Sequence, residues 1–212
     1  IGENLYDKMG GYDDIIATCI GHTHIDVAWK WRLCHTRRKA CRSFSTVTEL
    51  MEQYPGRQVK VVDTLCASLG QGLLVWYACQ KRDAGLSLEE LRDWCIATLP
   101  NLCMWFTVDD LFFLKRGGRV SAATAVVGSL LNIKPVLHVD NAGKLTNVSK
   151  ARGRKAAIDT MFENMKKSMF PIEQNQTVFI SHGDCIADAE YLANRIKTEL
   201  GTKTVDINYV GP

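Results

Sequence analysis

Two histidines and an aspartate near the start of the chain have the spacing of metal ligands. His22, His24 and Asp26 alternate with other residues, so on a β-strand their side chains would share one face. Neutral imidazole and carboxylate suit Zn²⁺. A catalytic zinc site needs three protein ligands and an open position, and a retaining glycosidase also needs two carboxylates about 5 Å apart. His24 and Asp26 are therefore candidate ligands, and no other segment completes the set.

A second candidate site lies around Gly117-Gly118-Arg119. The two glycines can adopt the φ > 0 conformation that ends a helix and lets the backbone approach a ligand. Arg119 would then leave a tight turn with a fixed direction. The alternative is a simple helix stop followed by a solvated arginine, but the apolar stretch and proline-led strand at residues 128–135 form a longer joint pattern.

Three weaker patterns favour structural interpretations. Gly70-Gln71-Gly72 at a helix start could bind phosphate, but it has neither the lysine of a P-loop nor the third glycine of a dinucleotide fingerprint. His182 follows a predicted strand, where a structural hydrogen bond is the favoured role over a catalytic one. Residues 30–42 are rich in lysine and arginine, and without a nucleic-acid-binding motif a solvated face is favoured. The sequence predicts no cofactor.

The elements that must position these residues alternate between strand and helix in the first half. This order predicts α/β structure with a largely parallel sheet. The expected strands are residues 15–20, 59–62 and 104–108, and the expected helices are residues 44–54, 70–83 and 87–99. Capping boxes at Thr46/Glu49 and Ser87/Glu90 support two of the helix starts.

The second half predicts a mixed α+β domain with antiparallel pairing. Asp140-Asn141-Ala142-Gly143 is typical of a hairpin turn. The expected strands are residues 135–139, 145–148, 178–181 and 205–210, and the expected helices are residues 153–169 and 187–200. The sequence thus predicts two domains, residues 1–108 and 109–212.

Composition excludes several classes of protein. The chain has 212 residues, 46% hydrophobic, and a net charge of +3 that gives no reason to expect nucleic-acid binding. No apolar run approaches the ~18 residues of a membrane span. Its eight cysteines form no C-x-x-C pair, which favours a reducing cytoplasm. The start at Ile1, with no basic-then-apolar leader, is typical of a fragment.

Residues 56–212, together with Tyr12-Asp13-Asp14-Ile15-Ile16, resemble the DegV family of bacterial two-domain proteins. The resemblance rests on the glycine–arginine block above and on four other motifs. These are Val61-Val62-Asp63-Thr64 with Ala67-Ser68-Leu69-Gly70-Gln71-Gly72, Lys150-Ala151-Arg152-Gly153-Arg154-Lys155, Ile180-Ser181-His182-Gly183, and Ile207-Asn208-Tyr209-Val210-Gly211-Pro212. The resemblance implies a two-lobed α/β fold, with a parallel-sheet first domain and a mixed α+β second domain.

The same resemblance implies a non-enzymatic carrier that holds a long-chain fatty acid in an apolar tunnel between the domains. In part of the family the carrier presents the acyl carboxylate to a fatty-acid kinase, and Arg119 and Arg152 would engage that partner. A solvated basic face is the alternative role of both arginines. The Thr-Ser-Gln-Pro and Ser-Gly-Thr-Tyr motifs of the family are absent here. By this resemblance, Ser68 is the hydroxyl-bearing residue that can be assigned as a contact of the ligand. Its alternative role is to cap the helix that follows.

Residues 21–55 resemble a different family, the zinc-dependent class II α-mannosidases. The similarity begins at Gly21-His22-Thr23-His24-Ile25-Asp26-Val27-Ala28-Trp29 and ends at Met51-Glu52-Gln53-Tyr54-Pro55. It implies that His24 and Asp26 bind zinc, although the other ligands and the nucleophile of that family have no counterpart here. The sequence therefore predicts a chimera, in which a DegV-type lipid carrier is the main hypothesis and a zinc-dependent glycosidase fragment is the alternative.

Overall fold

The computed structural model describes residues 33–53, 55–56, 58–111, 114, 132–174 and 176–210. Among these residues, none of the helices combines the length and the apolar character needed to cross a membrane. The helices are α2 (Leu33–Gln53), α3 (Leu69–Asp83), α4 (Leu88–Thr98), α7 (Arg154–Ser168) and α8 (Ile186–Arg195), with the short helical turns η2 (Leu99–Asn101), η3 (Ile172–Gln174) and η4 (Ile196–Leu200). The strands are β1 (Trp105–Thr107), β2 (Ile133–Val139), β3 (Leu145–Arg152), β4 (Thr177–His182) and β5 (Thr204–Tyr209).

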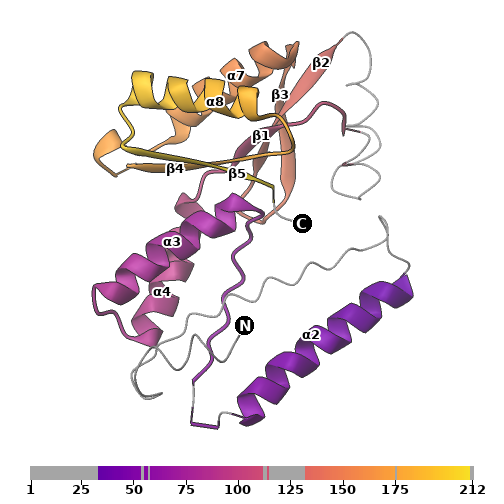
Figure 1. The fold of residues 1–212 in the computed structure, drawn as a ribbon, viewed down its shortest axis with the longest axis vertical. Coiled ribbons are helices and arrows are strands. Elements are labelled where there is room, and N and C mark those ends of the chain that lie inside the picture. Colours follow the sequence, from indigo (N-terminus) through magenta and orange to yellow (C-terminus); the bar gives the residue numbers. More distant parts are fainter. Residues whose placement is uncertain are drawn as a thin grey trace.

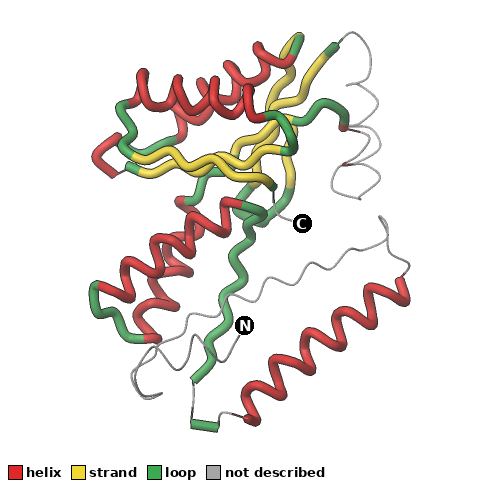
Figure 2. Tube along the Cα trace, viewed as in Figure 1, coloured by secondary structure: helices red, strands yellow, loops and turns green. Residues whose placement is uncertain are grey.

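The strands form one antiparallel sheet and one parallel pair, and both are visible in Figure 2. In the sheet β1-β2-β3, the hairpin turn at Asp140 joins β2 to β3, and a bulge interrupts their register between Val136 and Leu137. Gly143 has φ = +73° in this turn, a value that glycine adopts without strain. Strands β4 and β5 are parallel and are connected through α8. The mixed α/β class expected from the sequence is confirmed.

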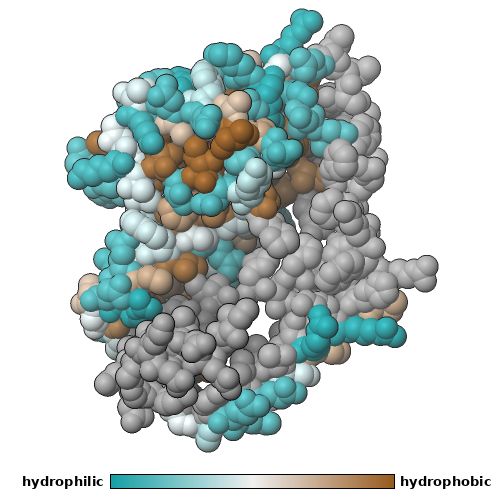
Figure 3. Space-filling model, viewed as in Figure 1, coloured by the Kyte–Doolittle hydropathy of each residue, from teal (hydrophilic) through white to brown (hydrophobic). Residues whose placement is uncertain are grey.

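The main core lies where α7 and α8 cover the strands (Figure 1). Val136, Ala157, Phe162 and Ile196 are completely buried there. Apolar side chains of the parallel strands, such as Val178 and Ile207, pack against this core while partly buried. Figure 3 shows hydrophobic side chains gathered beneath α8 on the same side of the molecule. Burial of the core residues contributes about 25 cal/mol per Å² of apolar surface, and this free energy holds the two helices on the strands.

A second cluster joins α3 to α4. Leu74 and Ala78 of α3 are buried against Leu91 and Cys95 of α4. The predicted capping box is present at the start of α4, because Ser87 Oγ accepts from Glu90 N and a Glu90 carboxylate oxygen accepts from Ser87 N at 2.8 Å. These contacts satisfy amide groups that a helix start otherwise leaves unpaired.

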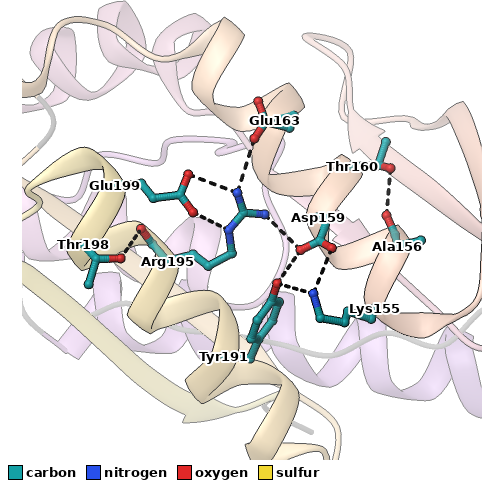
Figure 4. Close-up of polar contacts among 9 residues, drawn as sticks. All are labelled: Lys155, Ala156, Asp159, Thr160, Glu163, Tyr191, Arg195, Thr198 and Glu199. Carbon is teal, nitrogen blue, oxygen red and sulfur yellow. Dashed lines mark hydrogen bonds and ion pairs between the residues drawn. The ribbon is translucent and has the colours of Figure 1, made fainter.

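An ion-pair network on the α7–α8 surface is centred on Arg195 (Figure 4). Its guanidinium donates to Asp159 at 2.9 Å and pairs with Glu163 and Glu199, and it lies 4.1 Å from the centre of the Phe162 ring. The Tyr191 hydroxyl donates a hydrogen bond to Asp159, and this bond is the main reason that the pKa of the Asp159 carboxyl is lowered. The network joins the two helices and therefore has a structural role.

Several boundaries differ from the sequence expectation. Helix α2 begins at Leu33 and runs through Thr46, where a helix start was expected, because residues 33–53 contain neither glycine nor proline to interrupt it. The predicted strand 59–62 is wrong: residues 58–67 have no regular secondary structure and form no ladder. A strand requires a hydrogen-bonded neighbour, and none of the described residues pairs with this segment.

The described part of residues 1–108 contains a single strand, β1, and that strand pairs antiparallel with β2. The parallel pair β4–β5 lies instead in the C-terminal half. The remaining predicted strands and helices of residues 70–108 and 133–210 are confirmed within a few residues, apart from β3, which continues to Arg152. The expected strand 15–20 and the glycine–arginine block lie outside the described residues. The division into two domains at residue 108 stays a prediction.

Candidate functional site

A cavity of about 180 Å³ lies between segments that are far apart in the chain. Its walls come from the irregular segment before α3, the end of α4 with η2, the residues leading into β1, and the β2–β3 turn. The lining residues are Thr64, Leu65, Cys66, Ile96, Leu99, Pro100, Leu102, Met104, Asp140 and Asn141. An apolar cavity of about 150 Å³ holds a molecule as large as benzene. The described walls therefore accommodate a short apolar group.

The loop that forms one wall has an unusual backbone. Leu65 and Ser68 have φ values of +51° and +49°, which non-glycine residues rarely adopt. The Asp63 carboxylate accepts from Leu65 N at 3.1 Å, and Thr64 Oγ1 accepts from Cys66 N at 3.4 Å. Such strain costs on the order of 1–3 kcal/mol per residue and is found most often at ligand sites and switches. The loop thus holds Thr64 and Cys66 toward the cavity.

Close backbone approaches fix two other walls. A Cβ atom at Gly70, in the first turn of α3, would collide with Met104 Sδ, so a side chain at this position would displace a lining residue. The Gly143 Cβ position lies 3.3 Å from the Leu65 carbonyl oxygen, which brings the hairpin turn against the loop. Glycine at these two positions therefore lets α3 and the hairpin pack closely against the neighbouring walls.

The lining is mainly apolar, with a few polar groups from the segment before α3 and from the β2–β3 turn. The Asp140 carboxylate already accepts from Ala142 N and Lys144 N, both at 2.9 Å, so it belongs to the turn. Burial raises the pKa of the Cys66 thiol, which keeps it protonated and uncharged at neutral pH. Hydroxyl and amide groups of Thr64 and Asn141 remain as neutral hydrogen-bonding groups. Such a site fits an apolar molecule with a polar end.

The described site residues predicted from the sequence lie at different places. Ser68 is the N-cap residue of α3, two residues after the lining residue Cys66, and its side chain is exposed and makes no capping hydrogen bond. The capping role considered for Ser68 is therefore wrong. Arg152 is exposed at the end of β3, opposite the hairpin turn. Neither Ser68 nor Arg152 is among the residues that line the cavity, although Ser68 follows the lining segment directly in sequence.

His182 has the structural role that was favoured for it. Its side chain is 6% exposed, and its Nδ1 accepts the backbone N–H of Cys185 at 3.2 Å at the start of α8. Arg119, His24 and Asp26 lie outside the described residues. Within the described ranges, no group of three or more His, Cys, Asp or Glu residues could hold a metal ion.

Sequence reasoning missed most of the cavity lining. Thr64 belongs to a motif that was noticed, but Ile96, Leu99 and Asn141 have no local signal, because they line the cavity only after three segments pack together. The one available signal was the hairpin turn, whose glycine allows the close approach to Leu65.

Comparison with known families and proteins gives a consistent result. The model of the DegV family, described as an uncharacterised protein family, matches residues 35–212. A DegV domain-containing protein of Clostridium perfringens is 47% identical over 163 residues, which are 77% of this chain and 56% of that protein. The chain therefore spans a little over half the length of this relative.

Two solved structures of similar fold are described as fatty-acid binding or as loaded with a fatty acid. A DegV family protein from Thermus thermophilus, described as fatty-acid binding, is 28% identical with a TM-score of 0.63, and the match covers 83% of this chain and 59% of that one. The fatty acid kinase (Fak) B3 protein of Streptococcus pneumoniae, loaded with linoleic acid, has a TM-score of 0.70 at 23% identity, and the match covers 82% and 60% of the two chains. The second likeness shows the fold alone.

Proposed function

This chain belongs to the DegV family, and we propose that it binds a long-chain fatty acid as a carrier with no chemistry of its own. The observation that carries the proposal is the cavity beside the α3 loop, with its mainly apolar walls, the neutral side chains of Thr64 and Asn141, and the Asp140 carboxylate that accepts hydrogen bonds from the turn. The fatty-acid binding named for the Thermus thermophilus relative supports the choice of ligand. Free thiols at all described cysteines support a reducing, cytoplasmic location.

The acyl chain would gain affinity from burial alone. Each methylene moved from water into an apolar environment contributes about 0.8 kcal/mol, so a few buried methylenes give appreciable binding. The described cavity of about 180 Å³ would take one part of the chain, and we propose that it is one section of a longer tunnel. Leu99, Leu102 and Met104 provide the apolar contacts on one wall.

The carboxylate would be met near the start of α3. An unpaired buried charge is costly, so donors must face it. The Ser68 hydroxyl is not used in capping, and the positive end of the α3 dipole favours an anion at this position. The neutral side chains of Thr64 and Asn141 add hydrogen-bonding groups without adding a negative charge.

Substitution of Ser68 tests this assignment. We expect Ser68→Ala to weaken the binding of palmitate by about tenfold, because a hydrogen bond to a charged group is worth about 1.5–3 kcal/mol. The measurement is a fluorescence titration of the full chain. Ser45→Ala, an exposed serine within α2, is the matched control and should change nothing. The methyl ester of palmitate carries no charge, so its affinity should respond less to Ser68→Ala. Equal affinities of wild type and Ser68→Ala for palmitate would reject the assignment.

We propose further that a fatty-acid kinase recognises the lipid-loaded carrier through Arg152 and Arg119. Arg152 is exposed at the end of β3, and no hydrogen bond or ion pair occupies its guanidinium within the described ranges. Nearby basic residues are neutralised, since Lys134 and Arg154 both pair with Asp109. Arg152, like the exposed Lys150 two residues before it on β3, thus carries a charge that remains open to an acidic partner within the described ranges. Arg119 keeps its role as a prediction.

Arg152→Glu should lower the rate of acyl-phosphate formation by about tenfold, because reversing a charge at a partner surface slows electrostatically steered association. The measurement uses a bacterial fatty-acid kinase, ATP and the lipid-loaded carrier. Lys203→Glu changes the charge by the same amount at another exposed position and should leave the rate unchanged. Fatty-acid affinity should be unaffected in both variants. A rate that is the same for Arg152→Glu and Lys203→Glu would contradict the proposal.

The resemblance of residues 21–55 to class II α-mannosidases also stays a prediction, and with it the zinc site of His24 and Asp26. Helix α2 supplies the described part of this segment, and every side chain described on it is exposed. Elemental analysis of the purified chain distinguishes the alternatives, because a zinc site would give near-stoichiometric metal and a lipid carrier would not.

A further inference from the structure

A cysteine and a histidine outside the cavity form a close polar pair. Cys103 Sγ lies 3.7 Å from His138 Nε2 and 3.3 Å from Ser168 Oγ. The cysteine is exposed and the histidine is half-buried. Neither residue has a part in the carrier function proposed above.

The pairing of β1 with β2 explains why the two residues meet. Trp105 of β1 lies opposite His138 of β2, and Cys103 precedes Trp105 by two residues. Residues i and i+2 of an extended chain point to the same side, so Cys103 is the diagonal neighbour of His138 on one face. The contact therefore follows from strand register, and the 35 residues between the partners conceal it in the sequence.

The surroundings fix the imidazole and the thiol. The His138 ring packs edge-on against the Trp105 indole at a centroid distance of 4.6 Å. The indole N–H donates to Ser168 Oγ at 3.1 Å, and the Ser168 hydroxyl itself donates to the Asn164 carbonyl at 2.9 Å. Ser168 is thus held at the end of α7, with its oxygen facing Cys103. Few rearrangements are needed for the thiol to reach the imidazole.

The protonation state of His138 suits a base. Burial lowers its pKa, and the nearby Asp140 carboxylate offsets this only in part. A lowered histidine pKa leaves the imidazole neutral at neutral pH, so Nε2 can accept a proton. The thiolate is the reactive form of cysteine, and an adjacent imidazole promotes it.

The other described thiols lack this combination. Burial raises the pKa of the Cys66 and Cys95 thiols, which disfavours the thiolate. Cys34 and Cys41 are exposed on α2, and no polar partner of either sulfur is found within the described ranges. Cys185 is half-buried and receives a hydrogen bond from Arg154 at 3.4 Å, but that guanidinium is shared with Asp188 and Asp109.

We propose that Cys103 and His138 form a nucleophile–base pair that makes Cys103 a site of reversible modification by low-molecular-weight disulfides. His138 Nε2 takes the thiol proton, and Cys103 Sγ attacks one sulfur of the disulfide. A new S–S bond forms as the old one breaks, and the departing thiolate takes the proton from the imidazolium. Cys103 is oxidised to a mixed disulfide while half of the reagent is reduced to a thiol.

The test is labelling of the full chain with a limiting amount of an aromatic disulfide such as dithiobis(nitrobenzoate), followed by peptide mass mapping. The first label is expected on Cys103, and Cys103→Ser should remove the fastest kinetic phase. Cys41→Ser, which removes an exposed thiol with no histidine partner among the described residues, should keep that phase. His138→Gln keeps the thiol and should slow the phase at least about tenfold, a small part of what general base catalysis can supply.

Two controls separate catalysis from unfolding. In guanidinium chloride the rates of wild type and His138→Gln should become equal, because the pair exists only in the folded chain. If circular dichroism shows that His138→Gln does not fold, the mapping of the wild-type chain decides alone. First labelling at any other cysteine, or a folded His138→Gln variant with the wild-type rate, would overturn the proposal.

Discussion

Replacing Ile96 with tryptophan should weaken fatty-acid binding by about 100-fold. Ile96 lines the cavity from the last turn of α4, and it is 50% exposed, so the fold can accept a larger side chain there. An indole in a cavity of about 180 Å³ would displace several methylenes of the acyl chain. Four displaced methylenes correspond to about 3 kcal/mol, which gives the stated change in the dissociation constant.

Ile186→Trp is the matched control for this experiment. Ile186 is 48% exposed at the start of α8 and is not among the cavity residues, so the same change there should leave the affinity as it is. Leu99→Trp changes a half-buried lining position and should weaken binding as well. This second variant is needed because an indole at the exposed residue 96 could turn to solvent and leave the cavity unfilled. Titration of the three variants with palmitate decides, and wild-type affinity in both lining variants would refute a ligand at this site.

Truncating Phe162 should cause the largest loss of stability. Its side chain is completely buried in the main core between α7, α8 and the strands, and its ring contacts the Arg195 guanidinium. Replacement of a buried phenylalanine by alanine typically costs about 3–5 kcal/mol, because the lost contacts leave a cavity. Domains are stable by only about 5–15 kcal/mol, so Phe162→Ala should unfold at a much lower urea concentration.

Phe170→Ala makes the same chemical change at a position that is 50% exposed. Its unfolding midpoint should lie much closer to that of the wild-type chain, since surface substitutions usually change stability by about 0.5 kcal/mol or less. Urea unfolding followed by circular dichroism gives both values. Equal midpoints for the two variants would show that the α7–α8 core is not the centre of stability.

Features determined by a few neighbouring residues could be predicted from the sequence. The Ser87–Glu90 capping box and the hairpin turn at Asp140 depend on side chains within four residues of each other, and both are present. The family resemblance added the DegV fold, which the comparisons confirm, and the fatty-acid ligand, which stays a proposal for this chain. The role of Ser68 as a ligand contact stays a prediction, whereas the capping hydrogen bond considered for it is absent at the start of α3, where its φ is +49°.

Features that depend on distant segments could not be predicted. Residues 59–62 have strand composition, but a ladder needs a neighbouring strand, which composition does not provide. The cavity requires the hairpin turn to meet Leu65 and Gly70 to admit Met104, and both contacts are tertiary. The Cys103–His138 pair depends in the same way on the register of β1 against β2.

Native mass spectrometry of the chain purified from bacteria tests the central claim most directly. A DegV-type carrier should leave the cell with one fatty acid per chain, and palmitate added to delipidated protein should restore the same single adduct. The Ile96→Trp variant should lose most of this adduct, whereas Ile186→Trp should retain it. A folded wild-type chain that carries no lipid after purification, and takes up none from added palmitate, would contradict the carrier function.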